Sequence, residues 1–445
     1  MFIIKIIFIN TTLSFIIASD IFFLKPIAFV DYVSEGDDYV ISKKPVTLFG
    51  AGLNAYYKNN QWVINTEYIQ LGLFGDIDET IFSFSPRQSF PYLDDSKDAD
   101  GYWSEYAIAK IQYTSDNFEI NFGKFDRQWG YGQRFIQISD KAPSYPQIGL
   151  KWDIKENLTL VYFHGFLNSG ISDTSQSIHY NNSRFLKVSR NIAAHRITWE
   201  PSENITIGLN ESVIYATRII DPHYLIPVLP LYPIENYLGD TDNLQMGFDA
   251  EYLLNQNNKL YFGFFMDELT PEWIFSSKNH NWFAWQFGFN ANNIFFNSET
   301  IYIEYNWTDQ RIYKHKFNVN DYYSHEQPLG YWAGPHAQEF LINYELIIRN
   351  NTIFFEYYNV KRGLSTRSMV LDNYIDKQAS RFEHGSEKKQ SLNMLFEQSS
   401  KINGLFYRFG LSYVKFTNVG FSLSEIGISN EKLTLRLGIN YNFRN

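Results

Sequence analysis

Arg127 and Trp129 stand two positions apart, directly after the short alternating segment FEINFG. They share the parity of Asn121 on the polar side of that segment, so both are expected to point to the same side. An arginine next to an aromatic ring can bind a sugar chain through hydrogen bonds and ring stacking. The competing interpretation is an internal ion-pair network that holds the shape of the protein. Its further members would be Asp126, Arg134 and Asp140.

Three other groups of residues carry types that catalysis or metal binding uses. Asp267 and Glu268 are adjacent carboxylates, as acid–base chemistry on sugars requires, but adjacent residues on a strand point to opposite faces. His164 and Ser169 in HGFLNSG lack the strand–turn–helix context of a nucleophilic serine. The acidic stretch LDDSKDADGYW does not complete the calcium-loop pattern and is expected to be a solvated loop. We therefore predict no catalytic residue, no metal and no cofactor.

The elements that position these residues have a period of two. In EKLTLRLGINYNF, apolar residues occupy every odd position from Leu433 to Phe443, and polar or small residues occupy the even positions. The same alternation recurs in NITIGLN, WFAWQFGFN, TIYIEYNW and LFYRFGLSY. Such alternation is typical of strands with one apolar and one polar face.

Composition narrows the class of protein further. The chain has 445 residues with 38 basic and 48 acidic side chains, and this balance gives no indication of nucleic-acid binding. The absence of cysteine excludes disulfides and thiolate metal sites. The N-terminus MFIIKIIFINTTLSFIIASD, with Lys5 before an apolar run and Ala18 and Ser19 after it, resembles a secretory signal. No later run approaches the roughly 18 apolar residues of a membrane helix.

An exported, cysteine-free, aromatic-rich chain of this kind is either a secreted all-β protein or an outer-membrane barrel. Aromatic residues near strand ends, such as Trp307 and Tyr441, fit the girdles of a membrane barrel. Lipid cannot satisfy an open strand edge, so such a sheet must close. We predict an all-β fold, a single transmembrane antiparallel β-barrel of about eighteen strands with a polar lumen and long extracellular loops.

The predicted organisation has three parts: a signal peptide over residues 1–19, a short periplasmic N-terminal segment over 20–44 and the barrel over 45–445. The stretch DPHYLIPVLPLYP carries four prolines and is expected to be a loop that can fold into the lumen, neither strand nor helix. The longer connections are expected near 85–103, 169–190, 217–243, 267–281, 311–337 and 361–390.

Two polar residues of predicted strands, His195 and Glu211, fall on the apolar side of the alternation. In AAHRITWE, Arg196 falls on the polar side, whereas His195 shares the side of Ile197 and is expected to be structural, near an interface. Glu211 falls on the parity of Leu209, which would turn a carboxylate toward lipid. We therefore predict a bulge or a strand end at Glu211.

Four stretches follow one another along the chain: GKFDRQWGYGQRFIQISDKAPSYPQIGL, FHGFLNSG, AAHRITWEPSENITIGLNESVIY with PHYLIPV after it, and LGYWAGPHAQEF. Together they resemble the capsule assembly Wzi family, and the resemblance extends from about Gly50 to the end of the chain. It implies an outer-membrane barrel that holds capsular or related polysaccharide at the cell surface. Members can carry a helical periplasmic segment, for which residues 20–44 are too short.

We therefore predict a non-enzymatic protein of the bacterial outer membrane that binds, anchors or organises capsular or extracellular polysaccharide. A porin or transporter channel is the alternative, and a secreted carbohydrate-active enzyme is the third hypothesis. The expected partners are polysaccharide and outer-membrane lipid, not nucleic acid, while the oligomeric state and the identity of the polysaccharide stay open. The candidates for polysaccharide contact or for lining the lumen are Arg127, Trp129, Arg134, Asp140, Arg196, Tyr224, Asp267, Trp332 and His336.

Overall fold

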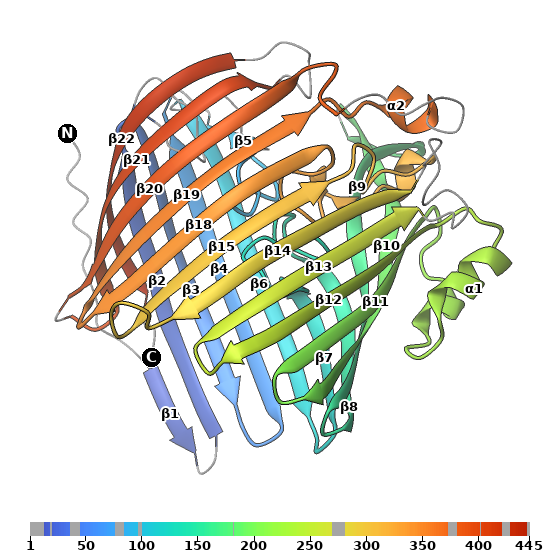
Figure 1. Ribbon diagram of the computed structural model, residues 1–445, viewed down its shortest axis with the longest axis horizontal. Helices are drawn as coiled ribbons and strands as arrows, with labels where there is room; N and C mark the ends of the chain where they lie inside the picture. The colour runs from blue at the N-terminus through green and yellow to red at the C-terminus, as the bar shows by residue number, and fades with distance from the viewer. Residues whose placement is uncertain are drawn as a thin grey trace.

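The computed structural model describes residues 13–17, 20–35, 45–75, 84–96, 100–180, 182–268, 281–372, 381–400, 402–420 and 428–442. Their main sheet is antiparallel and closes into a barrel, which Figure 1 shows from the side. Closure occurs where Ile27 to Val33 of β2 pair with Arg436 to Asn442 of β22. Of the twenty strands in this sheet, β1 and β5 pair with part of one neighbour, and the other eighteen form the ring. The predicted barrel of about eighteen strands is confirmed.

The elements follow one another along the chain with few helices between them. The strands are β1 (Leu13–Ile17), β2 (Asp20–Val33), β3 (Val46–Lys58), β4 (Trp62–Phe74), β5 (Asp94–Asp95), β6 (Gly101–Thr114), β7 (Phe118–Phe125), β8 (Tyr145–Lys155), β9 (Leu158–Tyr180), β10 (Asn182–Ser202), β11 (Ile205–Ala216), β12 (Asn243–Asn255), β13 (Asn258–Glu268), β14 (Trp282–Asn292), β15 (Glu299–Thr308), β16 (Tyr323–Ser324), β17 (Gln327–Pro328), β18 (Ala337–Ile348), β19 (Asn351–Gly363), β20 (Ser386–Ser399), β21 (Leu405–Val419) and β22 (Ile428–Asn442). The α-helices are α1 (Leu231–Tyr237) and α2 (Arg367–Asp372), and the 3-10 helices are η2 (Pro222–Leu225) and η4 (Asn318–Asn320).

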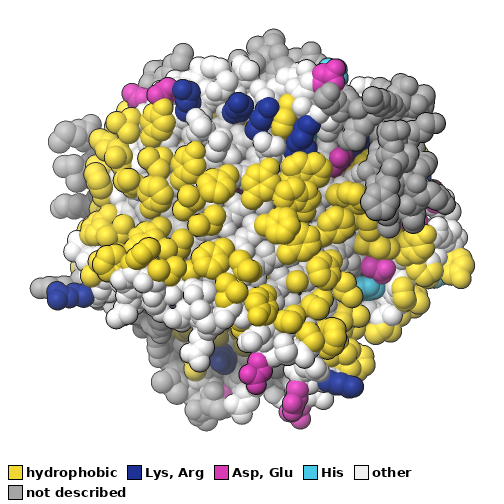
Figure 2. Space-filling view, viewed as in Figure 1, with side chains coloured by type: hydrophobic (Ala, Val, Ile, Leu, Met, Phe, Trp, Pro, Cys, Tyr) yellow, Lys and Arg dark blue, Asp and Glu magenta, His cyan; other side chains and the backbone are white. Residues whose placement is uncertain are grey.

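The alternation of the sequence becomes two faces of the barrel wall. On β22, Leu433, Leu435 and Leu437 are exposed, whereas the alternate residues Lys432 and Thr434 are buried. Exposed apolar side chains of this kind form a broad band across the face of the barrel that Figure 2 shows. Such a band is the surface that a barrel presents to lipid. None of the described helices is both long and apolar enough to cross a membrane.

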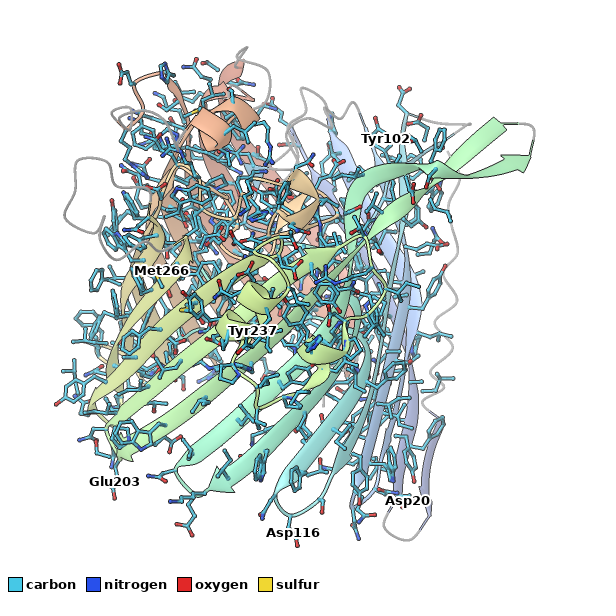
Figure 3. All side chains as sticks on the ribbon, turned by 90° about the vertical axis from the view of Figure 1, so that its right-hand side faces the viewer. Asp20, Tyr102, Asp116, Glu203, Tyr237 and Met266 are labelled. Carbon is cyan, nitrogen blue, oxygen red and sulfur yellow. The ribbon has the colours of Figure 1, made fainter. Side chains whose placement is uncertain are left out.

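The two ends of the barrel differ in the length of their connections. At one end the turns are short, as at Asp116 between β6 and β7 and at Glu203 between β10 and β11, both of which Figure 3 labels at the lower edge. At the other end lie the long connections, among them residues 126–144, 217–242 and 309–336. Outer-membrane barrels keep short turns on the periplasmic side and long loops outside, so the long-loop end is the extracellular end.

Two segments differ from the sequence-based expectation. Asp20–Val33, expected in a periplasmic segment, form β2 in the wall and pair with both β3 and β22. Their alternation places Val30 outward and Asp31 inward, but Pro26 and the preceding apolar run obscure the pattern in the sequence. Residues 169–190, expected as a loop, continue β9 and β10 into a hairpin that projects from the barrel (Figure 3). The signal peptide over 1–19 stays a prediction; within it, residues 13–17 form β1.

The proline-rich connection is the third difference. Residues 217–242, named here the outer cover, fold back against the outside of the wall, where Figure 1 shows α1. They bury the outward side chains of Val213 and Tyr215. The prediction that this stretch is not helical was wrong, because α1 begins at Leu231 and Pro233 falls in its first turn. Proline is tolerated there, since first-turn N–H groups have no helical partner.

Candidate functional site

Two connections fold into the lumen and pack against each other. They are residues 126–144, between β7 and β8, and residues 309–336, between β15 and β18, and we name them together the lumen plug. Ile136, Tyr313 and Tyr331 from the plug are almost completely buried in the main apolar cluster. The hydroxyl of Tyr313 donates to the carbonyl of Ile136 at 2.6 Å, so the two connections are joined directly.

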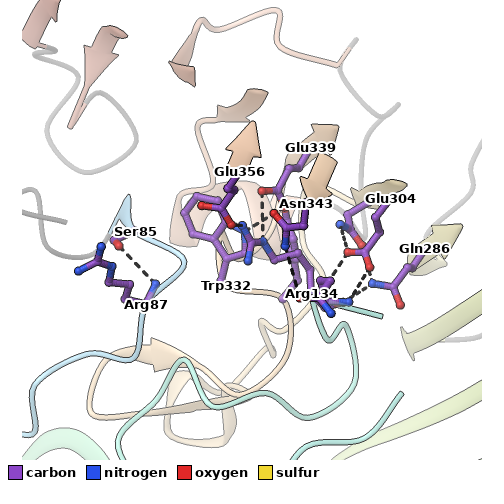
Figure 4. Close-up of polar contacts among 12 residues, drawn as sticks. Ser85, Arg87, Arg134, Gln286, Glu304, Trp332, Glu339, Asn343 and Glu356 are labelled. Atoms are coloured by element: carbon purple, nitrogen blue, oxygen red, sulfur yellow. Dashed lines mark hydrogen bonds and ion pairs between the residues drawn. The ribbon is translucent and has the colours of Figure 1, made fainter. Parts of the chain in front are cut away.

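Arg134 ties the first half of the plug to the far wall, as Figure 4 shows. Its guanidinium lies 3.4 Å from Glu339 on β18 and 3.1 Å from Glu356 on β19. Glu304 on β15 accepts the backbone N–H groups of Gln133 at 2.7 Å and Arg134 at 3.1 Å. Burial opposes the charge of Arg134, but the three glutamates outweigh it and hold its pKa above the ordinary value.

Gly132 shows how closely this loop approaches the wall. A Cβ atom at this position would lie 2.4 Å from a carboxylate oxygen of Glu304. Only glycine therefore lets the backbone reach the carboxylate that accepts its next two N–H groups. This gives a physical reason for the second glycine of the WGYG motif.

Arg196 anchors the same loop to the opposite wall. From β10 it points into the lumen, as its parity predicted, and pairs with Asp249 on β12. Gln137 of the plug accepts from the amide of Asn210 at 2.8 Å and lies 3.5 Å from Arg196. Tyr131 lies beside the same guanidinium, with its ring centroid 5.7 Å away. The plug is thus held from both sides of the barrel.

Asp267 holds the second half of the plug. Its carboxylate accepts the backbone N–H of Tyr313 at 2.6 Å and the side-chain amide of Gln245 at 3.2 Å. Adjacent to it in sequence, the side chain of Glu268 lies outside the described residues. Asp267 therefore fixes the plug's backbone, and these two contacts are structural.

Trp332 and His336 lie at the extracellular end of the plug. The indole N–H of Trp332 donates to Glu339 at 3.0 Å, and its ring packs against Phe84. The ring of His336 stacks on Phe382, and its Nδ1 lies 2.7 Å from the carbonyl oxygen of Leu364. Burial lowers the pKa of His336 to about 4, so the imidazole is neutral at physiological pH. Both side chains are buried and cannot contact a large polymer without rearrangement.

Arg127 and Trp129 also lie inside the barrel. The guanidinium of Arg127 donates to Gln147 at 2.8 Å and Asn121 at 3.2 Å, and it stacks 4.5 Å from the ring centroid of Phe163. Trp129 packs edge-on against the same phenylalanine. Burial lowers the pKa of Arg127 to about 10. These contacts are neutral hydrogen bonds and ring packing, and among the described residues Arg127 forms no ion pair with the predicted partners Asp126 and Asp140. Asp140 is half-buried near Asp126 and, among the described residues, forms no ion pair.

Tyr224 is the one candidate that the structure places outside the lumen. It belongs to the outer cover, where its hydroxyl donates to Asp242 at 2.7 Å and its carbonyl accepts from Tyr162. As a lining of the lumen this prediction was wrong, because the proline-rich connection folds outward. Sequence alone gives no sign of the side of the wall on which a long connection packs.

The contacts of Glu211 in the same region account for its outward-facing carboxylate. No bulge or strand end occurs there, since β11 pairs continuously with β10 and β12 through this position. Its carboxylate instead lies 3.0 Å from Nε2 of His195 and accepts the backbone N–H of Leu231 at 2.8 Å. Leu231 is the first residue of α1, so the outward carboxylate is used to hold the outer cover.

A pocket at the extracellular end offers a different kind of surface. It has a volume of about 190 Å³ and lies between the second half of the plug and the end of β19. Lys314 lies 3.9 Å above the ring centroid of Tyr323 there and 3.3 Å from Asp321. We name it the mouth pocket; its lining includes Lys314, Tyr323, Glu326, Gln327, Trp332 and Arg362. Of these, sequence analysis named only Trp332.

Sequence analysis did not identify the wall carboxylates that anchor the plug, although the alternation of polar and apolar residues already placed them on the lumen side. Glu304 stands on the polar side of the quoted segment TIYIEYNW, and Glu339 stands in LGYWAGPHAQEF. Alternation alone places such carboxylates in a lumen. It does not name the loop arginine that meets them, because that pairing joins residues about two hundred positions apart.

These features define a transmembrane β-barrel of the outer-membrane type with an internally folded plug. No family model and no curated protein matches the sequence. Among solved structures, the chain is similar to Escherichia coli Wzi, described as an outer membrane protein involved in group 1 capsule assembly and a carbohydrate-binding β-barrel. The two share 14% identity, with 94% of this chain and 85% of that chain covered and a TM-score of 0.58. This likeness confirms the fold that the resemblance to Wzi implied.

Two further solved structures match with lower TM-scores. Acinetobacter baumannii OccAB2 shares 8% identity over 94% of this chain and 96% of its own, with a TM-score of 0.46. Pseudomonas aeruginosa OprD shares 12% identity over 96% of this chain and 94% of its own, with a TM-score of 0.47.

Proposed function

We propose that this barrel binds extracellular polysaccharide at its mouth pocket and so anchors or organises the polymer at the cell surface. The observation that carries the proposal is the contrast between the lumen and the extracellular end of the barrel. The lumen holds a buried, ion-paired plug, whereas the extracellular end keeps a polar pocket that the half-buried Tyr323 helps to line. The carbohydrate binding stated for Wzi, which has a similar fold, supports the same assignment.

The chemistry of the mouth pocket suits a sugar chain. Tyr323 is half-buried, and Lys314 covers one face of its ring. We assign sugar stacking to the other face of the ring. Glu326 and Gln327 supply acceptors and donors for hydroxyl groups. Arg362, whose guanidinium also pairs with Glu387, supplies a cation for acidic sugars. A holding site of this kind needs no catalytic group, so we propose a non-enzymatic role.

Binding is tested with purified full-length protein and polysaccharide from the source strain. Tyr323→Ala should weaken binding several-fold, because aromatic contacts of this kind contribute about 0.5–1.5 kcal/mol. Tyr237→Ala is the matched control, since Tyr237 is 83% exposed on α1, outside the wall. Equal losses in both variants, or in neither, would contradict a site at the mouth pocket.

The cellular role is tested by the ratio of cell-bound to released polysaccharide in a deletion strain with a complemented control. Normal synthesis with shedding into the medium is the expected result. An unchanged ratio would remove the anchoring role and leave the likeness to Wzi as one of fold.

A channel is the second candidate, favoured by one observation. A cavity of about 250 Å³ lies in the lumen beside the plug, and its lining includes Arg87, Arg134, Glu356, Asn393 and Arg436. Polar cavities of this type can bind small ions or solutes. Planar-bilayer recordings of the wild-type protein test it: conductance at background would count against the channel, and regular unitary currents would support it.

A further inference from the structure

The outer wall changes character near the extracellular ends of β18 to β21. Along β19 the outward side chains Ile353, Phe355 and Tyr357 are followed by Asn359 and Lys361. The same change from apolar to amide to lysine occurs along β20, at Gln390 and Lys388. The apolar band therefore ends at one level on neighbouring strands, and a basic edge follows it.

Strand register brings these side chains into two rows. Asn359 lies opposite Gln390, and Gln390 lies opposite Lys415 on β21. The second row lies two residues further along each strand, toward the extracellular loops. There, Gln338 on β18 lies opposite Lys361, and Lys361 lies opposite Lys388. A groove of about 420 Å³ runs between them, with Phe340 at its apolar side. We name it the basic wall groove; its polar lining residues are Gln338, Glu339, Asn359, Lys361, Lys388, Gln390, Lys415 and Thr417. The side chain of Glu339 is turned into the lumen, where it pairs with Arg134.

The charges of this groove are not balanced by the wall itself. Lys361 and Lys388 are direct cross-strand neighbours, an arrangement that destabilises a sheet. Lys415 lies 3.5 Å from Glu431, but within the described part of the chain no carboxylate pairs with Lys361 or Lys388. The whole chain has a formal net charge of −10, so this concentration of cations is local. Lys361 lies 3.8 Å above the ring centroid of Phe382, a contact that leaves its charge uncompensated. Two lysines held side by side without a carboxylate partner favour an anionic ligand.

A fourth cation borders the groove. The guanidinium of Arg381 lies 4.5 Å from the ring centroid of Trp307 and donates to the carbonyl oxygens of Thr308 at 2.9 Å and Ala337 at 2.7 Å. Trp307 is itself opposite Gln338 in the strand register. An outward tryptophan at the edge of the apolar band marks the level of the lipid head groups. Figure 2 shows Lys and Arg side chains gathered along the upper edge of the band.

We propose that the basic wall groove binds the phosphorylated head group of an anionic glycolipid in the outer leaflet. Lys361 and Lys388 bind the phosphate, and the amides of Asn359 and Gln390 bond to sugar hydroxyls. The acyl chains lie on the apolar band below, where Phe340 and Met394 are exposed. This site is on the outside of the wall and is independent of polysaccharide binding at the mouth pocket.

The test uses the full-length protein in phosphatidylcholine nanodiscs, with and without bisphosphorylated lipid A. Lipid A should raise the thermal midpoint of the wild type. The double variant Lys361→Gln/Lys388→Gln should need about 30-fold more lipid A for the same shift, roughly fivefold for each lysine. In phosphatidylcholine alone the double variant should be as stable as the wild type or more so, because the like-charge pair is removed. This reversal between the two membranes separates ligand loss from misfolding.

Lys187→Gln is the matched control, since Lys187 is exposed on the projecting hairpin and should keep the wild-type response. Three results would overturn the proposal. The double variant could respond like the wild type; dephosphorylated lipid A could give the full shift, which would assign the effect to acyl chains alone; or inorganic phosphate without lipid A could give it, which would assign the groove to free anions.

Discussion

The guanidinium of Arg134 in the lumen lies 3.4 Å from the carboxylate of Glu339, a residue 205 positions further along the chain. This contact joins the first half of the plug to the wall that the second half enters, and Glu339 also accepts from Tyr331 and Trp332. One carboxylate therefore organises both halves of the plug.

Arg134→Gln tests how much the contacts of Arg134 with the wall glutamates contribute to stability. The substitution leaves Glu304, Glu339 and Glu356 close together without their cation, and breaking a buried pair of this kind costs about 3–5 kcal/mol. We expect a lower thermal midpoint in detergent and a higher conductance in planar bilayers, because the plug is released. Lys151→Gln is the control, since Lys151 and Asp153 form an exposed pair, worth about 0–1 kcal/mol. Wild-type stability and conductance in Arg134→Gln would refute the anchoring role.

Gly208→Ala tests the second anchor without changing any charge. A Cβ at Gly208 would lie 2.2 Å from the guanidinium of Arg196, which must then move away from Asp249. We expect a loss of about 1–3 kcal/mol, typical of overpacking, seen as a lower midpoint of unfolding. Gly263→Ala is the comparison, because the nearest atom there is the terminal methyl of Ile136 at 3.3 Å. Similar losses in both variants would show that the Arg196 pair is not the cause.

The barrel itself could be predicted from the sequence, because lipid and lumen impose opposite chemistry on alternate residues. Leu433 and Lys432 follow that rule, and so does Arg196. β2 was missed where Pro26 and an apolar N-terminal run hide the same alternation. Local patterns thus identify the strands wherever both faces have a distinct environment.

The sides on which the long connections pack could not be predicted. Tyr224 and Trp332 both stand in aromatic, proline-containing stretches, yet the first covers the outer wall and the second lies in the lumen. The difference comes from distant partners: Glu211 and His195 hold one connection outside, and Glu339 holds the other inside. Such pairings depend on strand register around the whole ring, which no single stretch encodes.

Glu211→Ala should release the outer cover. The carboxylate accepts the N–H of Leu231 at the start of α1, and capping contacts of this type contribute about 0.5–2 kcal/mol. We expect faster cleavage within residues 217–242 in limited proteolysis, with little change in unfolding of the barrel. Glu200→Ala serves as the control, because Glu200 is exposed at the opposite end of β10. Unchanged cleavage of the outer cover would mean that its apolar contacts alone hold it in place.

Lys141 makes the stability of the plug depend on pH. It is buried in the lumen, and burial, with the nearby charges of Lys389 and Arg362, lowers its pKa to about 7 from an ordinary 10.5. Between these values the unfolded chain binds the proton and the folded protein does not, so stability should rise as pH increases from about 7 toward 10. Lys141→Met cannot titrate and should lose this part of the slope. Thermal midpoints of both proteins across that range measure the difference, and parallel curves would show that Lys141 stays charged when buried.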